Sequence, residues 1–213
     1  MKERLICLLI GYALGCIQTA WLISKYHYRK DIRNYGSGNA GTTNMTRVFG
    51  IKSGVVTLVL DMLKGILAVC IAGWIYGFGF AFTHLRMWAG IGAILGHNYP
   101  FYLKFKGGKG IATSIGIWLA IDIRVFIIGF IVSVPLLIAT KYVSLASMTA
   151  MTAAFIASCF FYAGQPHGVE VILLAAFIML SALIRHHANI KRLIQGNENK
   201  FTFKKKENKE KEE

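Results

Sequence analysis

GHNYPFYLKFKGGKGIAT, residues 96–113, joins two strongly apolar segments and holds three glycines and three lysines between positions 104 and 110. Glycine lets a backbone approach a ligand closely, and successive N–H groups in such a turn can bind an anion beside lysine charges. A helix that begins near Ile111 would add its N-terminal N–H groups. The alternative is an ordinary basic loop of a membrane protein. The stretch is no Walker A loop, because Leu103 and Gly110 stand where Gly and Ser or Thr are required.

The composition is that of a membrane protein with several spanning segments. Of the 213 residues, 55% are apolar and 16% are charged, and the mean hydropathy is +0.51; a soluble domain carries roughly 25% charged residues. The net charge of +14 sits in loops and a tail beside apolar segments, which excludes a soluble nucleic-acid-binding module. Buried free thiols without zinc or haem spacing are expected at Cys7, Cys16, Cys70 and Cys159.

Apolar segments predict an all-α, polytopic membrane protein with about seven transmembrane helices. The segments are 5–24, 53–76, 87–96, 111–121, 125–140, 145–163 and 169–184. The shortest are too short to cross a ~30 Å hydrocarbon core at ~1.5 Å per residue, which is typical of tilted, re-entrant or protein-shielded segments. The alternative is five full spans, with two of the short segments re-entrant. We expect one membrane domain, residues 1–200, and a charged, disordered cytoplasmic tail, residues 201–213.

The positive charges predict an N-terminus outside and a C-terminus in the cytoplasm. With seven spans, the connections at 25–52 and 104–109, residue 141 and the tail from 185 share one side of the membrane. Positive charge favours the cytoplasmic side. Those connections hold every lysine and arginine except Lys2, Arg4, Lys64, Arg86 and Arg124.

Three polar clusters then face the cytoplasm. The first, SGNAGTTN at 37–44 with Arg47 behind it, suits a phosphate or a polyol, or merely caps the next helix. The second is the glycine–lysine loop, residues 104–110. The third, RHHANIKRLIQGNE at 185–198, puts His186 and Asn189 on one helical face if the last helix continues. A histidine there can hold or relay a proton, or simply anchor the helix end.

Together the clusters supply many cations and donors and few acids, which suits a phosphorylated substrate at the inner membrane face. No metal site is expected, because the histidines lack carboxylate or thiol partners at ligand spacing, and no Gly-x-Ser-x-Gly elbow is present. A transporter for an organophosphate anion is the alternative, and would bury ionisable residues mid-membrane. Asp61 and Lys64 are the candidates, but their spacing also lets them pair with each other.

At these clusters the chain resembles the PlsY family of bacterial acyl-phosphate:glycerol-3-phosphate acyltransferases. The first motif of the family is similar to Ser37-Gly38-Asn39-x-Gly41-x-Thr43-Asn44 with Arg47. The second is similar to Gly96-His97 and Pro100, followed by FKGGKGIAT at 105–113. The third is similar to Arg185-His186-x-x-Asn189-Ile190-x-Arg192-Leu193 with Gly196 and Glu198. The resemblance covers roughly residues 11–200. The chain departs from the family pattern at Thr42, usually alanine, and at Cys16-Ile17-Gln18, usually Ser-Ile-Pro.

The resemblance implies transfer of a fatty acyl group from acyl phosphate to the 1-hydroxyl of glycerol 3-phosphate. The products are lysophosphatidic acid and phosphate, the first step of phospholipid synthesis, made at the cytoplasmic face of the bacterial inner membrane. An activated donor needs no cofactor or covalent nucleophile, only positioning and electrostatics. We expect a monomer in the lipid bilayer, with no cofactor, metal or nucleic acid. The lack of a His-x-x-x-x-Asp motif disfavours an acyl-CoA or acyl-carrier-protein donor.

The same resemblance assigns roles to residues. The expected catalytic residues are His186, Asn189, Ser37, Arg47 and Lys109. Those expected to bind substrate are Gly38, Asn39, Gly41, Thr43, Asn44, Lys106, Gly107, Gly108, Gly110, Thr113, Ser144 and Arg192, with Glu198 structural. Residues 106–110 are expected to bind the phosphate of glycerol 3-phosphate. Either His186 or a substrate phosphate would accept the hydroxyl proton.

Overall fold

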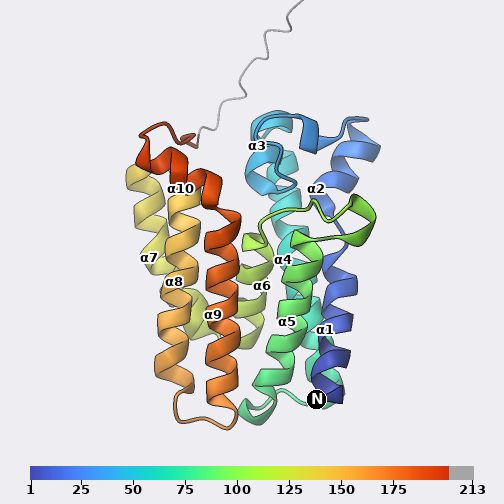
Figure 1. The fold of residues 1–213 in the computed structure, drawn as a ribbon, viewed down its shortest axis with the longest axis vertical. Coiled ribbons are helices and arrows are strands. Elements are labelled where there is room, and N and C mark those ends of the chain that lie inside the picture. The colour runs from blue at the N-terminus through green and yellow to red at the C-terminus, as the bar shows by residue number, and fades with distance from the viewer. Residues whose placement is uncertain (202–213) are drawn as a thin grey trace, which may run out of the picture.

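Seven long helices run roughly side by side in the computed structural model, which describes residues 1–201 (Figure 1). They are α1 (Lys2–Gly15), α4 (Ile51–Tyr76), α5 (Thr83–Asn98), α6 (Ile111–Ile121), α7 (Ile123–Thr140), α8 (Val143–Tyr162) and α9 (Gly168–Arg185). The shorter helices are α2 (Thr19–Leu22), a π-helical turn η1 (Ile23–His27), α3 (Thr42–Phe49), α10 (His187–Ile194) and the 3₁₀ turns η2 (Ile32–Asn34), η3 (Phe80–Phe82) and η4 (Phe101–Leu103). The predicted tail lies outside the described residues, apart from Phe201.

The prediction of an all-helical membrane protein is confirmed. Within residues 1–201, five segments are long and apolar enough to span a bilayer: Lys2–His27, Ile51–Tyr76, Ile123–Thr140, Val143–Tyr162 and Gly168–Arg185. The other two predicted segments are also helices, but α5 has 16 residues and α6 has 11. At ~1.5 Å per residue α6 is ~16 Å long, about half of the hydrocarbon core. The number of full crossings stays a prediction.

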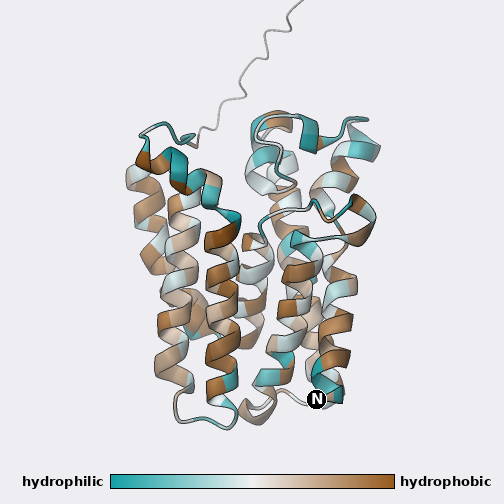
Figure 2. Ribbon diagram, viewed as in Figure 1, coloured by the Kyte–Doolittle hydropathy of each residue, from teal (hydrophilic) through white to brown (hydrophobic). Residues whose placement is uncertain are grey.

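Apolar residues cover the middle of the long helices, and hydrophilic residues gather towards the two ends (Figure 2). Large apolar side chains point outward along the bundle, among them Trp74, Ile138, Phe160 and Leu173. Such a surface is unfavourable in water, and it is the surface that a hydrocarbon solvent requires.

Helices α1 and α5 pack closely because glycines line their contact. A Cβ atom placed on Gly11 would lie 1.9 Å from the carbonyl oxygen of Ala89, and one on Gly92 would lie 2.1 Å from that of Leu8. Small residues let membrane helices approach to backbone contact. This contact fixes α5, whose last turn carries the glycine–lysine loop.

The ends of the bundle differ. The N-terminus lies at one end, whereas α3 and α10 cover the other, and α6 begins below their level, inside the bundle (Figure 1). The sequence did not predict α3 or α10 as helices. The last long helix does not continue through the third cluster. Helix α9 ends at Arg185, His186 forms the junction, and α10 starts at His187.

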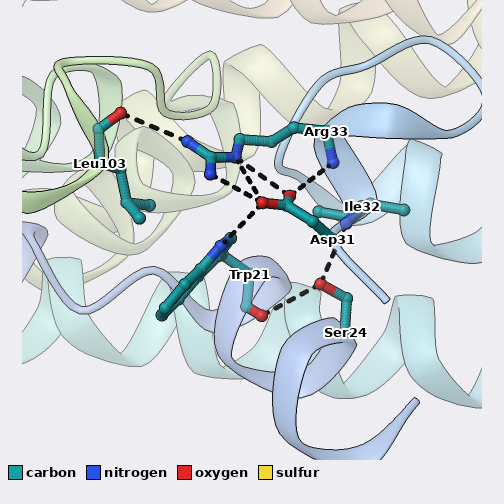
Figure 3. Close-up of polar contacts among 6 residues, drawn as sticks. All are labelled: Trp21, Ser24, Asp31, Ile32, Arg33 and Leu103. Carbon is teal, nitrogen blue, oxygen red and sulfur yellow. Dashed lines mark hydrogen bonds and ion pairs between the residues drawn. The ribbon is translucent and has the colours of Figure 1, made fainter. Parts of the chain in front are cut away.

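A polar contact ties the first connection to the glycine–lysine loop (Figure 3). The carboxylate of Asp31 accepts hydrogen bonds from Trp21 Nε1 at 3.2 Å and from Arg33 Nη2 at 2.7 Å. Arg33 Nη1 also donates to the carbonyl oxygen of Leu103 at 3.3 Å. The hydrogen bond from Arg33 lowers the pKa of Asp31 to about 2. The two connections therefore share one charged anchor.

A second charged contact closes the opposite end of the bundle. Arg4 of α1 donates two hydrogen bonds to Glu170 of α9, from Nε at 2.5 Å and from Nη2 at 2.7 Å. Trp88 Nε1 of α5 donates to the same carboxylate at 2.7 Å. Three helices that are distant in sequence therefore meet at one carboxylate.

Candidate active site

The three polar clusters line one cavity of about 1,090 Å³ at the end of the bundle that α3 and α10 cover. Every predicted site residue lines it except Gly108 and Thr113. The first cluster enters from the loop before α3, the second from the glycine–lysine loop, and the third from the α9–α10 junction. Residues more than 140 positions apart in sequence, such as Ser37 and His186, thus face one space.

In the first cluster, Asn44 holds the loop together rather than offering its side chain to a ligand. Its Oδ1 accepts from the backbone N–H of Ser37 at 2.9 Å, and its Nδ2 donates to the carbonyls of Tyr35 and Ile32 at 3.0 and 3.3 Å. The amide is buried and fully used. Asn44 also lines the cavity, and its role in substrate binding stays a prediction. Arg47, in contrast, makes no hydrogen bond or ion pair with any residue of 1–201.

In the second cluster, α6 begins at Ile111, where the sequence predicted a helix start. Gly110 is its N-cap, with a φ of +78° that favours glycine. The first-turn N–H groups of 111–113 have no backbone acceptor among the described residues. The entrance to α6 therefore offers donors to an anion in the cavity.

The adjacent glycines do not form the predicted cradle of exposed N–H groups. Gly107 N–H donates to the carbonyl of Asn98 at 3.1 Å, and Gly108 N–H donates to that of His97 at 3.0 Å. Both amides are thus used by the end of α5. A Cβ atom on Gly107 would lie 2.1 Å from the carbonyl oxygen of His97, so glycine is needed for close packing.

Gly108 and Thr113 are the two members of the predicted binding set that do not line the cavity. Gly108 faces His97, and Thr113 is fully buried against α4, where a Cβ atom on Gly65 would lie 2.4 Å from its carbonyl oxygen. Their positions in the motif therefore serve packing. Sequence alone gave no sign of this, because the contacts come from other helices.

The third cluster forms a hydrogen-bonded network centred on Glu198. Its carboxylate accepts from Asn189 Nδ2 at 2.6 Å, from Arg192 Nε at 2.7 Å and from Ser144 Oγ at 2.9 Å. Asn189 Oδ1 in turn accepts from Lys109 Nζ. The network joins α8, α10 and the glycine–lysine loop, which supports the structural role predicted for Glu198. Burial raises the pKa of Glu198, but the hydrogen bonds outweigh it and leave that pKa lowered.

Arg185 is a cavity residue that the predicted set omits. Its Nη2 donates to the carbonyl oxygens of Gly108 at 2.7 Å and Gly107 at 3.3 Å, and its guanidinium lies 5.2 Å from the ring centroid of Tyr99. It therefore supports the loop from α9. Its place beside His186 in the third cluster was the available signal.

Crowded cations shape the protonation of the site. Burial lowers the pKa of Lys109 to about 8; Glu198 opposes the shift, whereas Arg192, Arg185 and Arg47 reinforce it. Burial likewise lowers the pKa of Arg47. A bound anion would relieve this repulsion, so the free site is poised to take up negative charge.

His186 is held as a neutral imidazole. Its Nδ1 lies 2.7 Å from the carbonyl oxygen of Ala182, an acceptor, so Nδ1 carries the hydrogen and Nε2 has the lone pair. Burial, and then the charge of Lys109, lowers the pKa of His186 to about 4. At neutral pH it can accept a hydrogen bond through Nε2, but it is a weak proton acceptor.

An apolar cavity of about 230 Å³ adjoins the polar one. The two share Leu58, Ile115, Phe130, Ser133 and Ala150 in their linings. The deeper part is lined by large side chains, including Trp118, Phe126 and Met151. A molecule with an anionic head and a hydrocarbon tail would fit both spaces.

One group among the described residues has ligand atoms close enough for a metal: His84, His167 and Glu170. It lies at the other end of the bundle from the cavity (Figure 1). The Glu170 carboxylate is occupied by Arg4 and Trp88, and the two imidazole rings stack 3.9 Å apart at 31°. Stacked rings do not converge their in-plane lone pairs on one ion, so the donors do not fit a metal.

Comparison with known proteins matches this chain to one enzyme family. The family model described as glycerol-3-phosphate acyltransferase matches residues 5–196. A glycerol-3-phosphate acyltransferase of Thermoanaerobacter pseudethanolicus is 39% identical over 193 residues, which cover 91% of this chain and 93% of the relative.

Two crystal structures described as PlsY (YgiH), an integral membrane glycerol 3-phosphate acyltransferase, have the same fold. Its glycerol 3-phosphate form superposes with a TM-score of 0.83 and 38% identity, covering 93% of this chain and 96% of that one. Its lysophosphatidic acid form gives a TM-score of 0.80 and 37% identity, covering 94% and 96%.

Proposed function

This chain belongs to the glycerol-3-phosphate acyltransferase family, and we propose from that premise that it transfers a fatty acyl group from acyl phosphate to the 1-hydroxyl of glycerol 3-phosphate. The products are lysophosphatidic acid and phosphate. The chain is an acyltransferase of an integral membrane family. The donor, the membrane face and the roles of individual residues are the parts that we propose.

The observation that carries the proposal is the meeting of three cationic clusters beside an apolar cavity. The substrates are two phosphorylated molecules, one with a long hydrocarbon tail. The polar cavity offers Arg47, Lys109, Arg192 and the first turn of α6 to the phosphates. The apolar cavity offers hydrocarbon contacts to the acyl chain.

The reaction needs positioning more than a strong base. The hydroxyl oxygen bonds to the acyl carbonyl carbon, the bond from that carbon to the phosphate oxygen breaks, and the hydroxyl proton ends on a phosphate. The acids that line the cavity, Asp61 and Glu198, are both engaged with other groups. We assign His186 to orient the hydroxyl through Nε2, because a pKa of about 4 makes it a weak base. A substrate phosphate then accepts the proton.

The remaining roles follow from the contacts. Lys109 and Arg47 bind phosphate oxygens and neutralise the charge that develops during transfer. Asn189 holds Lys109 and Glu198 in place, and Ser37 offers a hydroxyl donor from the first cluster. We place the site on the cytoplasmic face of the bacterial inner membrane, because the positively charged connections 25–52 and 104–109 and helix α10 lie towards the same end of the bundle (Figure 1). We propose that one chain suffices, since all three clusters come from it.

The test is a two-substrate assay on the purified protein in detergent or lipidic mesophase. Acyl phosphate and glycerol 3-phosphate are supplied, and phosphate and lysophosphatidic acid are both measured. Phosphate release should need both substrates and should fall by at least a hundredfold in His186→Ala. His187→Ala is the matched control, because His187 is exposed and does not line the cavity. Equal loss in both variants would contradict the assignment of His186.

The same sample separates the transporter alternative. A transporter would carry unpaired ionisable groups mid-membrane along its path, but the two candidates, Asp61 and Lys64, pair with each other at 2.9 Å. Saturable uptake of glycerol 3-phosphate into proteoliposomes, without acyl transfer by the same folded protein, would overturn the proposed reaction.

A further inference from the structure

A buried polar cluster lies beside the glycine–lysine loop in the wall of the polar cavity, and the proposed chemistry gives it no role. It consists of Asp61 and Lys64 on α4 and His97 on α5. Their exposed fractions are 1%, 4% and 3%. Burying charged groups is costly unless they are paired and hydrogen-bonded, so the cluster needs a physical account.

Lys64 is the centre of this cluster. Its Nζ lies 2.9 Å from Asp61 Oδ1, 2.7 Å from His97 Nδ1 and 2.9 Å from the carbonyl oxygen of Ile17. An ammonium group has three donors and no acceptor. It is within hydrogen-bond distance of Ile17 and His97 and forms an ion pair with Asp61, so its partners come from α4, α5 and the connection after α1.

These contacts determine where the hydrogen of His97 lies. A protonated lysine can only donate, so Nδ1 of His97 must accept. The proton stays on Lys64 because the Asp61 carboxylate, 2.9 Å away, compensates the charge of the ammonium group. The imidazole hydrogen is therefore on Nε2.

The Nε2 side of His97 faces the loop. A Cβ atom placed on Gly108 would lie 2.1 Å from His97 Nε2 and 2.7 Å from the carbonyl oxygen of Ala40. The backbone of His97 holds the same point, because its carbonyl accepts from Gly108 N–H at 3.0 Å and from Gln18 Nε2 at 2.8 Å. Gly108, the residue before Lys109, is thus packed between His97 and Ala40 of the first cluster.

We propose that Asp61 and Lys64 are positioning residues for the acceptor phosphate, acting through His97. By holding His97 as the Nε2–H tautomer, they fix the side of the imidazole against which Gly108 rests, and Gly108 in turn lies against the Ala40 carbonyl. The glycine–lysine loop then carries Lys109 at a fixed position beside α3. This inference rests on the proposed function, because it deepens the account of how glycerol 3-phosphate is bound.

The test replaces the charged pair with a neutral one. Lys64→Met alone leaves a buried unpaired carboxylate and should fold poorly, whereas Asp61→Asn/Lys64→Met removes both charges at similar size. The double variant should fold, raise the KM for glycerol 3-phosphate about tenfold, and leave kcat and the KM for acyl phosphate within twofold. Tyr162→Phe is the matched control. Tyr162 lies at the end of α8 far from the cavity, and the change removes its buried hydrogen bond to Asp122.

A spectroscopic measurement reads the tautomer directly. Nitrogen-15 labelling of histidine should show His97 as a single Nε2–H tautomer in the wild type and as a mixture in the double variant. His97→Gln keeps a donor towards the loop and should hold the KM within threefold, whereas His97→Leu should raise it about tenfold. This second pair tests the inference even if the double variant does not fold.

Distinct results overturn the two proposals. Absence of turnover in the folded wild type would contradict the proposed function, while the tautomer measurement would still test the positioning role of Asp61 and Lys64. A wild type with mixed His97 tautomers would overturn this inference even with normal turnover. So would a double variant that loses thermal stability but keeps the wild-type KM, because the cluster would then only support the fold.

Discussion

The pH at which Lys109 loses its proton gives the sharpest test of the site. Its pKa is lowered to about 8, mainly by burial and further by the neighbouring arginines, against a partial opposing effect of Glu198. Lys109 is then about 90% cationic at pH 7 but only about 10% cationic at pH 9. Because the lowered pKa is that of a cation, the positive charge is lost as the pH rises through 8. Binding of the acceptor phosphate should weaken over the same range.

The expected size follows from the lost contact. A hydrogen bond to a charged group contributes roughly 1.5–3 kcal/mol, so complete loss of the Lys109 charge should lower kcat/KM by about 10- to 150-fold. Above pH 8 the fall should approach tenfold per unit until that floor is reached. A bound phosphate raises the pKa of Lys109, so kcat should turn down at a higher pH than kcat/KM.

The assay measures kcat/KM for glycerol 3-phosphate from pH 6.5 to 10, with a blank for spontaneous hydrolysis of acyl phosphate. Lys109→Arg is the informative variant, because a guanidinium stays charged throughout this range. Its activity at pH 7 can be lower, but its profile should be flat above pH 8. An alkaline fall of the same shape in Lys109→Arg would refute the reasoning, because the titrating group would then be another residue.

Four further changes have expected outcomes. Glu198→Gln loses one charge-assisted contact of the Asn189–Arg192–Ser144 network, so the melting temperature should fall by several degrees and kcat by about tenfold, measured by thermal unfolding and turnover. Gly108→Ala places a methyl group against His97 and should lower both the yield of folded protein and the affinity for glycerol 3-phosphate, which calorimetry would measure. The Arg33 hydrogen bond holds the pKa of Asp31 at about 2, so the Asp31 carboxylate stabilises the fold above pH ~4 and this stabilisation is lost as the pH falls through 2. The difference in melting temperature between wild type and Asp31→Asn should therefore disappear over that pH range in thermal melts. Phe126→Ala should lengthen the apolar cavity and shift kcat/KM towards longer acyl donors by about fourfold for each added methylene. Competition assays between donors of different length measure this shift, and an unchanged preference would mean that the acyl group binds elsewhere.

Local pattern predicted the elements that local physics controls. The apolar runs predicted each long helix, and Gly110 before Ile111-Ala112-Thr113 predicted where α6 begins. The three-residue spacing of Asp61 and Lys64 predicted their pairing, which the structure confirms at 2.9 Å. In each case, the residues that decide the outcome are neighbours in sequence.

What sequence could not predict depends on partners from distant elements. The amides of Gly107 and Gly108 are taken by the end of α5, and nothing in the loop itself indicates this. Asn44 reads as a ligand-binding amide, but Ser37, Tyr35 and Ile32 fold back around it. The helices α3 and α10 have eight residues each, too short for a clear periodic pattern, and they form where they pack over the cavity.

The contact of Arg4 with Glu170 bears on how the protein is made. Translation supplies α1 first and α9 almost last, yet the two are joined at one carboxylate. His186, Asn189 and Glu198 follow α9, so a nascent chain still emerging from the ribosome has the phosphate-binding loops but no complete site. Biogenesis therefore delays acyl transfer until the last helix has been inserted. A chain truncated after α8 would keep six of the seven long helices but lack His186, Asn189 and Glu198, so we expect it to be inactive.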